Sequence, residues 1–314
     1  MSRKRILLWG GTGFIGRALA SAISNTGAEL TILKRSSSSM SHFDQKLRFI
    51  EYESNSPQRS KDVLRDAVKN SDVIYNLAGT SGAVASNLDP LAHLEANCQS
   101  QLQFLEACRE AGNRPHVVFA SSRLVYGKPV VLPVDETHPL APGSVYAVHK
   151  LAVEGYHQIW SAQGAITSTI CRISVCYGQD GWTGKRDHGF LNTLIFGAKQ
   201  GKPLTIFGGG DQIRDYIHVR DLCRALLLCG DSSRVVNEIV NVGSGEGITI
   251  AQVAQMISAA SGAPVVNVPW PAEHLNVETG DYVGDIAKLS ALTGFKPALS
   301  MERGIAEELA AITV

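Results

Sequence analysis

The 314-residue sequence has no excess of charge of either sign, because 29 lysines and arginines balance 29 aspartates and glutamates. Nucleic-acid-binding proteins usually carry a basic excess, so its absence argues against a nucleic-acid partner. Hydrophobic residues make up 44% of the chain and charged residues only 18%. This composition argues against a disordered chain and indicates a folded protein with a substantial core.

Long hydrophobic runs and paired cysteines are also missing. No stretch reaches the roughly 18 apolar residues that a membrane span needs. The apolar run near the N-terminus is too short for a signal peptide, so we expect a cytoplasmic protein with no membrane partner. The six cysteines include no C-x-x-C pair, and no histidines cluster at metal-ligand spacing. We therefore expect buried free thiols and no metal site.

A strict glycine repeat, by contrast, follows the first apolar run. Residues 9–16 read WGGTGFIG, which places Gly10, Gly13 and Gly16 three residues apart. Glycine alone turns through positive φ without a Cβ clash, and the following Arg17–Thr26 has helical spacing. The pattern predicts a strand, a tight turn and a helix N-terminus that holds a pyrophosphate. Taken alone, it fits a simple compact turn equally well.

Strand-like apolar runs alternate with helical stretches in the first half of the chain. The intervening segments are long enough for crossover helices, which predicts an α/β fold with a doubly wound parallel sheet of the Rossmann type. After about residue 175, glycine-rich and proline-punctuated segments follow. We therefore expect a dinucleotide-binding domain over 1–174, with chain returns near 215–245, and a smaller, mainly substrate-binding lobe over 175–314. Strands are expected at Arg5–Trp9, Leu30–Leu33, Leu47–Glu51, Val73–Leu77, Val117–Ala120 and Thr167–Ile173, and further helices at Asp62–Asn70, Pro90–Ala111 and Val145–Ala162.

Tyr146 and Lys150 are four residues apart, so on a helix they face the same way. Ser122 lies 24 residues upstream of Tyr146, directly after a predicted strand. That is the carboxyl edge at which open α/β sheets bind ligands. The three residues are candidate catalytic groups. The alternatives are that Tyr146 is a core aromatic, Lys150 a solvated helix charge and Ser122 a helix cap.

Together these motifs resemble the extended short-chain dehydrogenase/reductases, and in particular the NAD-dependent epimerases and dehydratases that act on nucleotide sugars. The likeness covers essentially the whole chain. Further motifs that carry it are Asn76-Leu77-Ala78-Gly79, Val125-Tyr126-Gly127, Asp89-Pro90 with Asn97, Gly201-Lys202-Pro203-Leu204, the segment 214–221, Asn241-Val242-Gly243-Ser244-Gly245 and Gly294-Phe295-Lys296-Pro297.

The resemblance implies an enzyme that transfers a hydride between a sugar carbon and a nicotinamide. Tyr146 would exchange the hydroxyl proton, with Ser122 bonded to the same oxygen. Lys150 and the positive nicotinamide would favour the Tyr146 phenolate. The resemblance also implies a homodimer formed through the helices Pro90–Ala111 and Val145–Ala162. Its cofactor contacts would be Gly10, Gly13, Phe14, Ile15, Gly16, Leu77, Ala78, Gly79, Asn97, Tyr146 and Lys150.

Two cations stand where dinucleotide-binding proteins usually carry the acid that binds the adenosine ribose. Lys34 and Arg35 end the second predicted strand, and they suit a 2′-phosphate, so the sequence favours NADP, with NAD as second choice. Alternatively, both residues cap a surface loop. Glu53 matches the acid that often bonds the adenine amino group in the family, although it fits a solvated loop charge equally well.

The positions after Ser122 argue against one reaction of the family. Dehydratases carry Asp-Glu there to move protons around C5 and C6, whereas this sequence has Arg123 and Leu124. A keto-sugar reductase using NADPH and a 4-epimerase with tightly bound NAD both remain, and Lys34 with Arg35 favours the reductase. Two further alternatives are a reductase of non-sugar carbonyls and a non-catalytic NADP(H)-binding sensor.

The expected substrate is a nucleotide sugar. Arg214 is the candidate for binding its diphosphate, because a guanidinium fork matches phosphate oxygens; the alternative is a structural ion pair with Asp215 or Asp221. Arg123 is a second candidate substrate contact. Val175 stands where the family usually has an asparagine that contacts the diphosphate, which keeps the non-sugar alternative open.

Overall fold

The computed structural model describes residues 3–35, 47–52, 57–178 and 189–312. Its larger sheet confirms the predicted doubly wound fold, because the seven strands are all parallel and run in the order β10-β6-β5-β4-β1-β2-β3. The strands are β1 (Arg5–Trp9), β2 (Glu29–Arg35), β3 (Arg48–Tyr52), β4 (Val73–Asn76), β5 (His116–Ser122), β6 (Thr167–Ile173) and β10 (Ile239–Val242).

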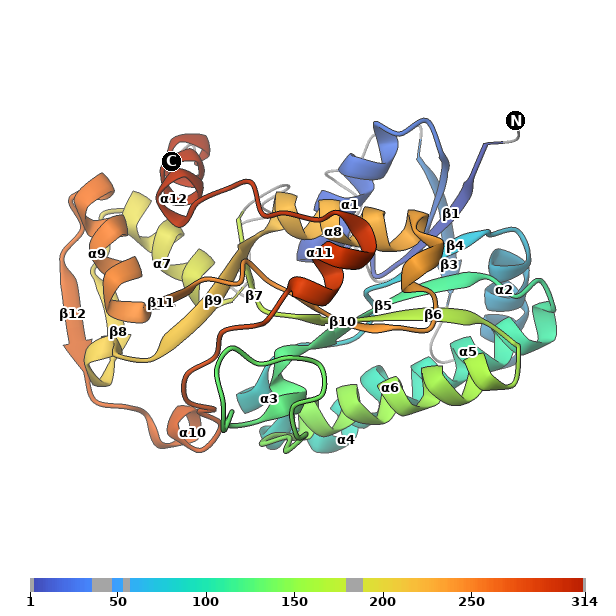
Figure 1. Cartoon of the computed structure of the whole chain (residues 1–314), viewed down its shortest axis with the longest axis horizontal. Coiled ribbons are helices and arrows are strands. Elements are labelled where there is room, and N and C mark those ends of the chain that lie inside the picture. The colour runs from blue at the N-terminus through green and yellow to red at the C-terminus, as the bar shows by residue number, and fades with distance from the viewer. Residues whose placement is uncertain (1–2, 36–46, 53–56, 179–188, 313–314) are drawn as a thin grey trace.

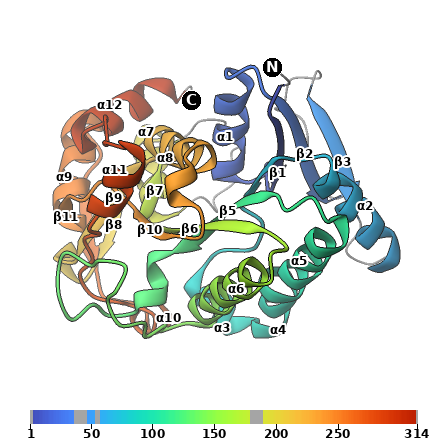
Figure 2. The same cartoon turned by 45° about the vertical axis from the view of Figure 1, so that its right-hand side comes forward.

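Helices cover both faces of this sheet (Figures 1 and 2). One face carries α1 (Phe14–Ser24), α8 (Val219–Asp231) and α11 (Ala287–Thr293), and the other carries α2 (Pro57–Lys69), α5 (Ser100–Ala111) and α6 (Val145–Ala162). Neighbouring residues of a strand point to opposite faces. Leu8 accordingly packs in the core under α1 and α8, whereas Leu7 packs in the core under α2 and α5.

The structure corrects two predicted helices. The first begins at Phe14 instead of Arg17, because Gly13 is its N-cap. The helix expected at Pro90–Ala111 is divided into α4 (Pro90–Leu94), a π-helical turn (Glu95–Gln99) and α5. A π turn depends on local backbone hydrogen bonds, which apolar periodicity does not report. A short helix that the sequence did not predict, α3 (Ala83–Leu88), precedes α4.

A second lobe is built around two small sheets. One holds β7 (Val175–Tyr177), β9 (Ile213–His218) and β11 (Gly247–Thr249), and the other holds β8 (Leu204–Phe207) and β12 (Val265–Val268). Tyr177, Leu194, Ile257 and Leu309 share one core in this lobe. The lobe's three longer helices are α7 (Phe190–Lys199), α9 (Ile250–Ser261) and α12 (Met301–Ala311).

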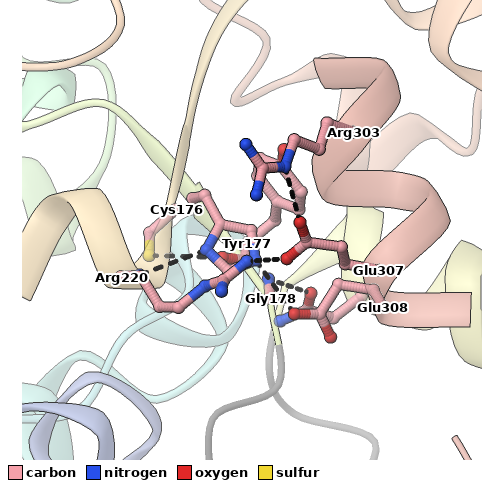
Figure 3. Close-up of polar contacts among 9 residues, drawn as sticks. Cys176, Tyr177, Gly178, Arg220, Arg303, Glu307 and Glu308 are labelled. Atoms are coloured by element: carbon pink, nitrogen blue, oxygen red, sulfur yellow. Dashed lines mark hydrogen bonds and ion pairs between the residues drawn. The ribbon is translucent and has the colours of Figure 1, made fainter. Parts of the chain in front are cut away.

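Helix α12 is fixed to the start of α8 by a group of charged side chains (Figure 3). Glu307 on α12 lies between Arg220 and Arg303 and pairs with both. The buried His218, which ends β9, lies 2.9 Å from Glu308 through its Nε2 atom. These contacts hold the C-terminal helix against the junction of the two lobes.

All six cysteines are free, and five of them are buried. Within the part of the chain that the structure describes, no helix is both long enough and apolar enough to cross a membrane.

Candidate active site

The glycine turn follows the carboxyl end of β1, which lies next to β4 at the point where the strand order of the large sheet reverses. Gly10 has a φ of +85°, and a Cβ there would come 2.7 Å from the carbonyl carbon of Leu77. A Cβ on Gly16 would collide with the carbonyl oxygen of Gly10. Gly13 caps α1 without a side-chain hydrogen bond. The turn is thus a backbone cradle at a helix N-terminus, which fits the pyrophosphate of a dinucleotide.

The chain after β4 forms the next wall of this edge. A Cβ on Gly79 would collide with the side-chain oxygen of Asn97. Asn97 accepts a 3.1 Å hydrogen bond from the backbone N–H of Thr80 and donates a 3.0 Å bond to its hydroxyl. His93 Nδ1 lies 3.4 Å from both of these side chains. The structure therefore adds Thr80 and His93 to the site, for which the sequence carried no signal.

Ser122, Tyr146 and Lys150 come together at the carboxyl end of β5. Ser122 is the last residue of β5, and Tyr146 and Lys150 lie one turn apart at the start of α6. The Lys150 ammonium donates a 2.7 Å hydrogen bond to the carbonyl oxygen of Ala120 and lies 5.8 Å from the centre of the Tyr146 ring. The Ser122 hydroxyl bonds Tyr146 and also accepts from the N–H of Leu124 at 3.2 Å.

Burial sets the protonation of this group. It raises the pKa of Tyr146 to about 12, and the hydrogen bond with Ser122 opposes the shift. Burial also lowers the pKa of Lys150 to about 8, against the pull of Glu154 and Cys98. At pH 7 the protein alone therefore holds Tyr146 as a neutral phenol and Lys150 mainly as an ammonium. Formation of the phenolate requires further positive charge, which a bound oxidised nicotinamide would bring.

A buried ion pair supports the same strand end. Glu154, one turn beyond Lys150 on α6, accepts a 2.7 Å bond from Arg172 at the end of β6. Its carboxylate also accepts from the hydroxyl of Ser121. The Arg172 guanidinium lies 4.8 Å from the centre of the Tyr126 ring. This network ties α6 to β5 and β6 through long-range contacts of Glu154 that no sequence motif indicated.

Two of the candidate substrate residues, Arg214 and Arg123, contact the segment 278–282, which is part of the connection between α10 (Ala272–Leu275) and α11. Arg214 on β9 pairs with Glu278 at 2.5 Å and bonds the carbonyl oxygen of Gly280 at 2.7 Å. Its partner is thus neither Asp215 nor Asp221, which the sequence offered as alternatives. Arg123 bonds the hydroxyl of Thr279 at 3.1 Å.

Val175 lies on β7, the strand next to β9, which carries Arg214. It is the first residue of β7 and pairs with Tyr216 of β9. Its side chain packs against the core of the second lobe.

The cations at the end of β2 are not equivalent. The Lys34 ammonium lies 2.6 Å from the Glu51 carboxylate on β3, and its side chain is only 4% exposed. Arg35 is exposed. Glu53 lies outside the described residues. The positive charge of Lys34 is therefore already paired within the protein, whereas Arg35 is accessible to a ligand.

Comparison with known proteins yields a consistent group of relatives. The model of the NAD dependent epimerase/dehydratase family matches residues 6–243. A UDP-glucose 4-epimerase of Azospirillum brasilense is 29% identical and covers 97% of this chain and 94% of its own. A UDP-N-acetyl-alpha-D-glucosaminuronate decarboxylase of Bacillus cytotoxicus is also 29% identical, over 98% and 97% of the two chains. The crystal structure of the Thermus thermophilus UDP-glucose 4-epimerase complex with NAD superposes with a TM-score of 0.86 at 26% identity, over 98% of both chains.

Proposed function

Since the chain belongs to the NAD-dependent epimerase/dehydratase family, whose members are enzymes, we propose that it is a nucleotide-sugar 4-epimerase. The observation that carries this proposal is the placement of Ser122, Tyr146 and Lys150 beside a glycine cradle at one sheet edge. The related epimerase and decarboxylase support a UDP-linked sugar as the substrate.

The glycine cradle and the start of α1 would hold the dinucleotide. Backbone N–H groups at Phe14, Ile15 and Gly16 would bind the pyrophosphate at the positive helix end. Leu77, Ala78 and Gly79 would line the opposite side of the dinucleotide, and Asn97 and Lys150 would hold its nicotinamide end. When bound, the nicotinamide supplies the hydride acceptor and donor for the sugar carbon.

Tyr146 would act as the acid and base. It would take the proton of the sugar C4 hydroxyl when C4 is oxidised to a ketone, and it would return a proton to that oxygen after the keto-sugar has turned over and C4 is reduced on its other face. Ser122 holds the same oxygen by a hydrogen bond. Lys150, fixed on Ala120, favours the phenolate by its charge. Arg123 and Leu124 supply no carboxylic acid for elimination, so the proposal excludes dehydration.

Arg214 would bind the substrate diphosphate. Of its five N–H donors, two bond the carbonyl oxygens of Ile213 and Gly280 and one bonds Glu278. The Nε proton and one Nη2 proton are left for phosphate oxygens. Val175 would form an apolar part of the wall in place of the family's usual amide.

We propose NAD rather than NADP as the cofactor because of the environment of Lys34. A cation that is buried and paired with Glu51 offers little to a 2′-phosphate. An epimerase returns its hydride within one turnover, so it has no need of a dissociable NADPH. The nicotinamide dinucleotide that copurifies therefore becomes diagnostic of the reaction.

A keto-sugar reductase using NADPH is the second candidate, and exposed Arg35 is the observation that favours it. A guanidinium at the end of β2 suits a 2′-phosphate. If NADP is the cofactor, R35A weakens NADP binding at least tenfold and changes NAD binding by less than threefold. Equal effects on both dinucleotides would contradict a 2′-phosphate contact.

We also propose the division of labour and the assembly that the sequence predicts. Residues 1–174, with the return through β10, would bind the dinucleotide, and residues 175–314 would mainly bind the substrate. A homodimer would form through α4, α5 and α6.

Two measurements test the proposed reaction. The purified protein is denatured and the released nucleotide is identified by mass. The folded protein is separately incubated with UDP-glucose and UDP-galactose without added nucleotide. Near-stoichiometric NAD together with interconversion of sugars is the expected result. Release of NADP(H), or a requirement for added NADPH and a keto-sugar, would establish the reductase instead.

A further inference from the structure

Arg123 is a cation that directly follows Ser122, a residue of the proposed reaction centre, in the sequence. It begins a 3₁₀ turn, Arg123–Tyr126. The guanidinium lies 5.2 Å from the centre of the Tyr282 ring and donates one hydrogen bond to the hydroxyl of Thr279. In the part of the chain that the structure describes, no carboxylate pairs with Arg123.

The surroundings leave this cation uncompensated. Burial and the repulsion of Arg214 lower the pKa of Arg123 to about 10, against the attraction of Tyr282, Glu278 and Tyr216. Glu278 is the carboxylate shared by this region, but it pairs with Arg214 and accepts from the N–H of Gly280 at 2.9 Å. Of the two guanidinium groups, only Arg214 pairs with a carboxylate among the described residues, and the charge of Arg123 remains unpaired.

Such an arrangement is costly without an anionic ligand. Burying a charge is unfavourable unless the charge is paired and hydrogen-bonded. A guanidinium presents five N–H donors in a fork that matches a carboxylate, and the Thr279 hydroxyl occupies one of them. The remaining donors are suited to an acid that arrives with the substrate.

The position along the chain indicates which part of a sugar would meet this side chain. Consecutive Cα atoms are about 3.8 Å apart, so the Arg123 side chain starts one residue from the Ser122 hydroxyl. If that hydroxyl holds the oxygen on C4, as the proposed function requires, the nearest further groups are the substituents on C3 and C5. A carboxylate on one of these two carbons would come within reach of Arg123.

We propose that Arg123 selects an acidic nucleotide sugar by pairing with a carboxylate carried next to C4, as in a hexuronate. This inference rests on the proposed function and narrows its substrate class. It assigns a specificity role to a residue whose position the dehydratases use for an acid. Arg214 keeps the diphosphate, so the two arginines bind different anionic groups of one substrate.

The test measures binding to the nucleotide-loaded protein by calorimetry, with UDP, UDP-glucose and UDP-glucuronate as ligands. The wild type is expected to bind UDP-glucuronate at least tenfold more tightly than UDP-glucose. R123M should lower this preference at least tenfold, and R123K should restore part of it. UDP-N-acetylmuramate, whose carboxylate belongs to a lactyl ether on O3, distinguishes the C3 side of C4 from the C5 side. Thermal unfolding of each variant verifies that it is folded.

The outcomes separate the two proposals. If the wild type binds neither UDP nor any of the sugars, the proposed function is wrong and this inference falls with it. If the wild type binds the neutral and acidic sugars equally, or if R123M weakens UDP and all sugars by the same factor, only the inference is overturned. Equal weakening of UDP and all sugars by R123M would indicate that Arg123 binds the diphosphate.

Discussion

The Lys150 ammonium donates a 2.7 Å hydrogen bond to the carbonyl oxygen of Ala120, two residues before Ser122. This bond joins the start of α6 to the end of β5 and thereby fixes the position of Lys150 relative to Ser122. Glu154 and Arg172 reinforce the same junction one helical turn later. The site is therefore held together by contacts between elements that are far apart in the sequence.

Replacement of the proposed acid and base should abolish turnover without emptying the cofactor site. In Y146F the phenol proton is lost, and we expect kcat to fall by about 10²- to 10⁴-fold, the range for general acid–base groups. The measurement is the steady-state rate with whichever of UDP-glucose and UDP-glucuronate the wild type converts, with bound nucleotide quantified in the same preparation. A variant that retains a tenth of the wild-type rate would contradict the role of Tyr146.

Closure of the glycine cradle should prevent dinucleotide binding. In G16A the new methyl group collides with the carbonyl oxygen of Gly10, whereas the matched helical substitution G197A meets only the Cβ of Lys202 at 3.8 Å. We expect copurified nucleotide to fall at least tenfold in G16A and to stay at the wild-type level in G197A. Normal nucleotide content in a folded G16A protein would disprove the cradle.

Acid should destabilise the protein partly through His157. This side chain is fully buried, stacks on Phe119 at 4.6 Å and bonds the hydroxyl of Ser168 at 2.8 Å. Burial lowers its pKa to about 3. Between pH 6.5 and pH 3, His157 is therefore protonated in the unfolded chain and neutral in the native protein. The stabilisation is present above the unfolded pKa and is lost as the pH falls below it.

The matched measurement compares the wild type with H157Q in urea at pH 7.5 and pH 5.5. The wild type should lose about 1.4 kcal/mol more unfolding free energy over this interval, close to the value of one pKa unit. His116 and His149, whose pKa values burial also lowers, contribute to both proteins and cancel. An equal loss in the two proteins would show that His157 does not carry the effect.

Exposed apolar residues on the helices beside the site should be covered by a second copy. Leu88 on α3 is 77% exposed and Leu91 on α4 is 76% exposed. L91E should convert a dimer to a monomer in sedimentation at micromolar concentration. V266E is the control, because Val266 is 40% exposed on the distant strand β12. A wild-type monomer under the same conditions would contradict the proposed dimer.

The sequence predicts the sheet and the meeting of Ser122, Tyr146 and Lys150 because both follow from local patterns. Apolar runs report strands, and a spacing of four reports one helix face. The π turn that places Asn97 leaves no such pattern, because it depends on backbone hydrogen bonds. Glu51 as the partner of Lys34 and Glu278 as the partner of Arg214 are also long-range pairings. Spacing along the chain could not identify either carboxylate, although each one neutralises its cation and so limits what that cation can bind.

In the proposed epimerase, Tyr146, Ser122 and Lys150 assist the removal of a hydride from C4 and its return to the same carbon. The most direct test uses UDP-glucose and UDP-glucuronate, each labelled with deuterium at C4 and incubated separately with the purified protein in ordinary water without added nucleotide. We expect a C4 epimer of at least one sugar with its deuterium still at C4. An epimer that has lost the label to solvent, or no epimer from either sugar, would contradict it.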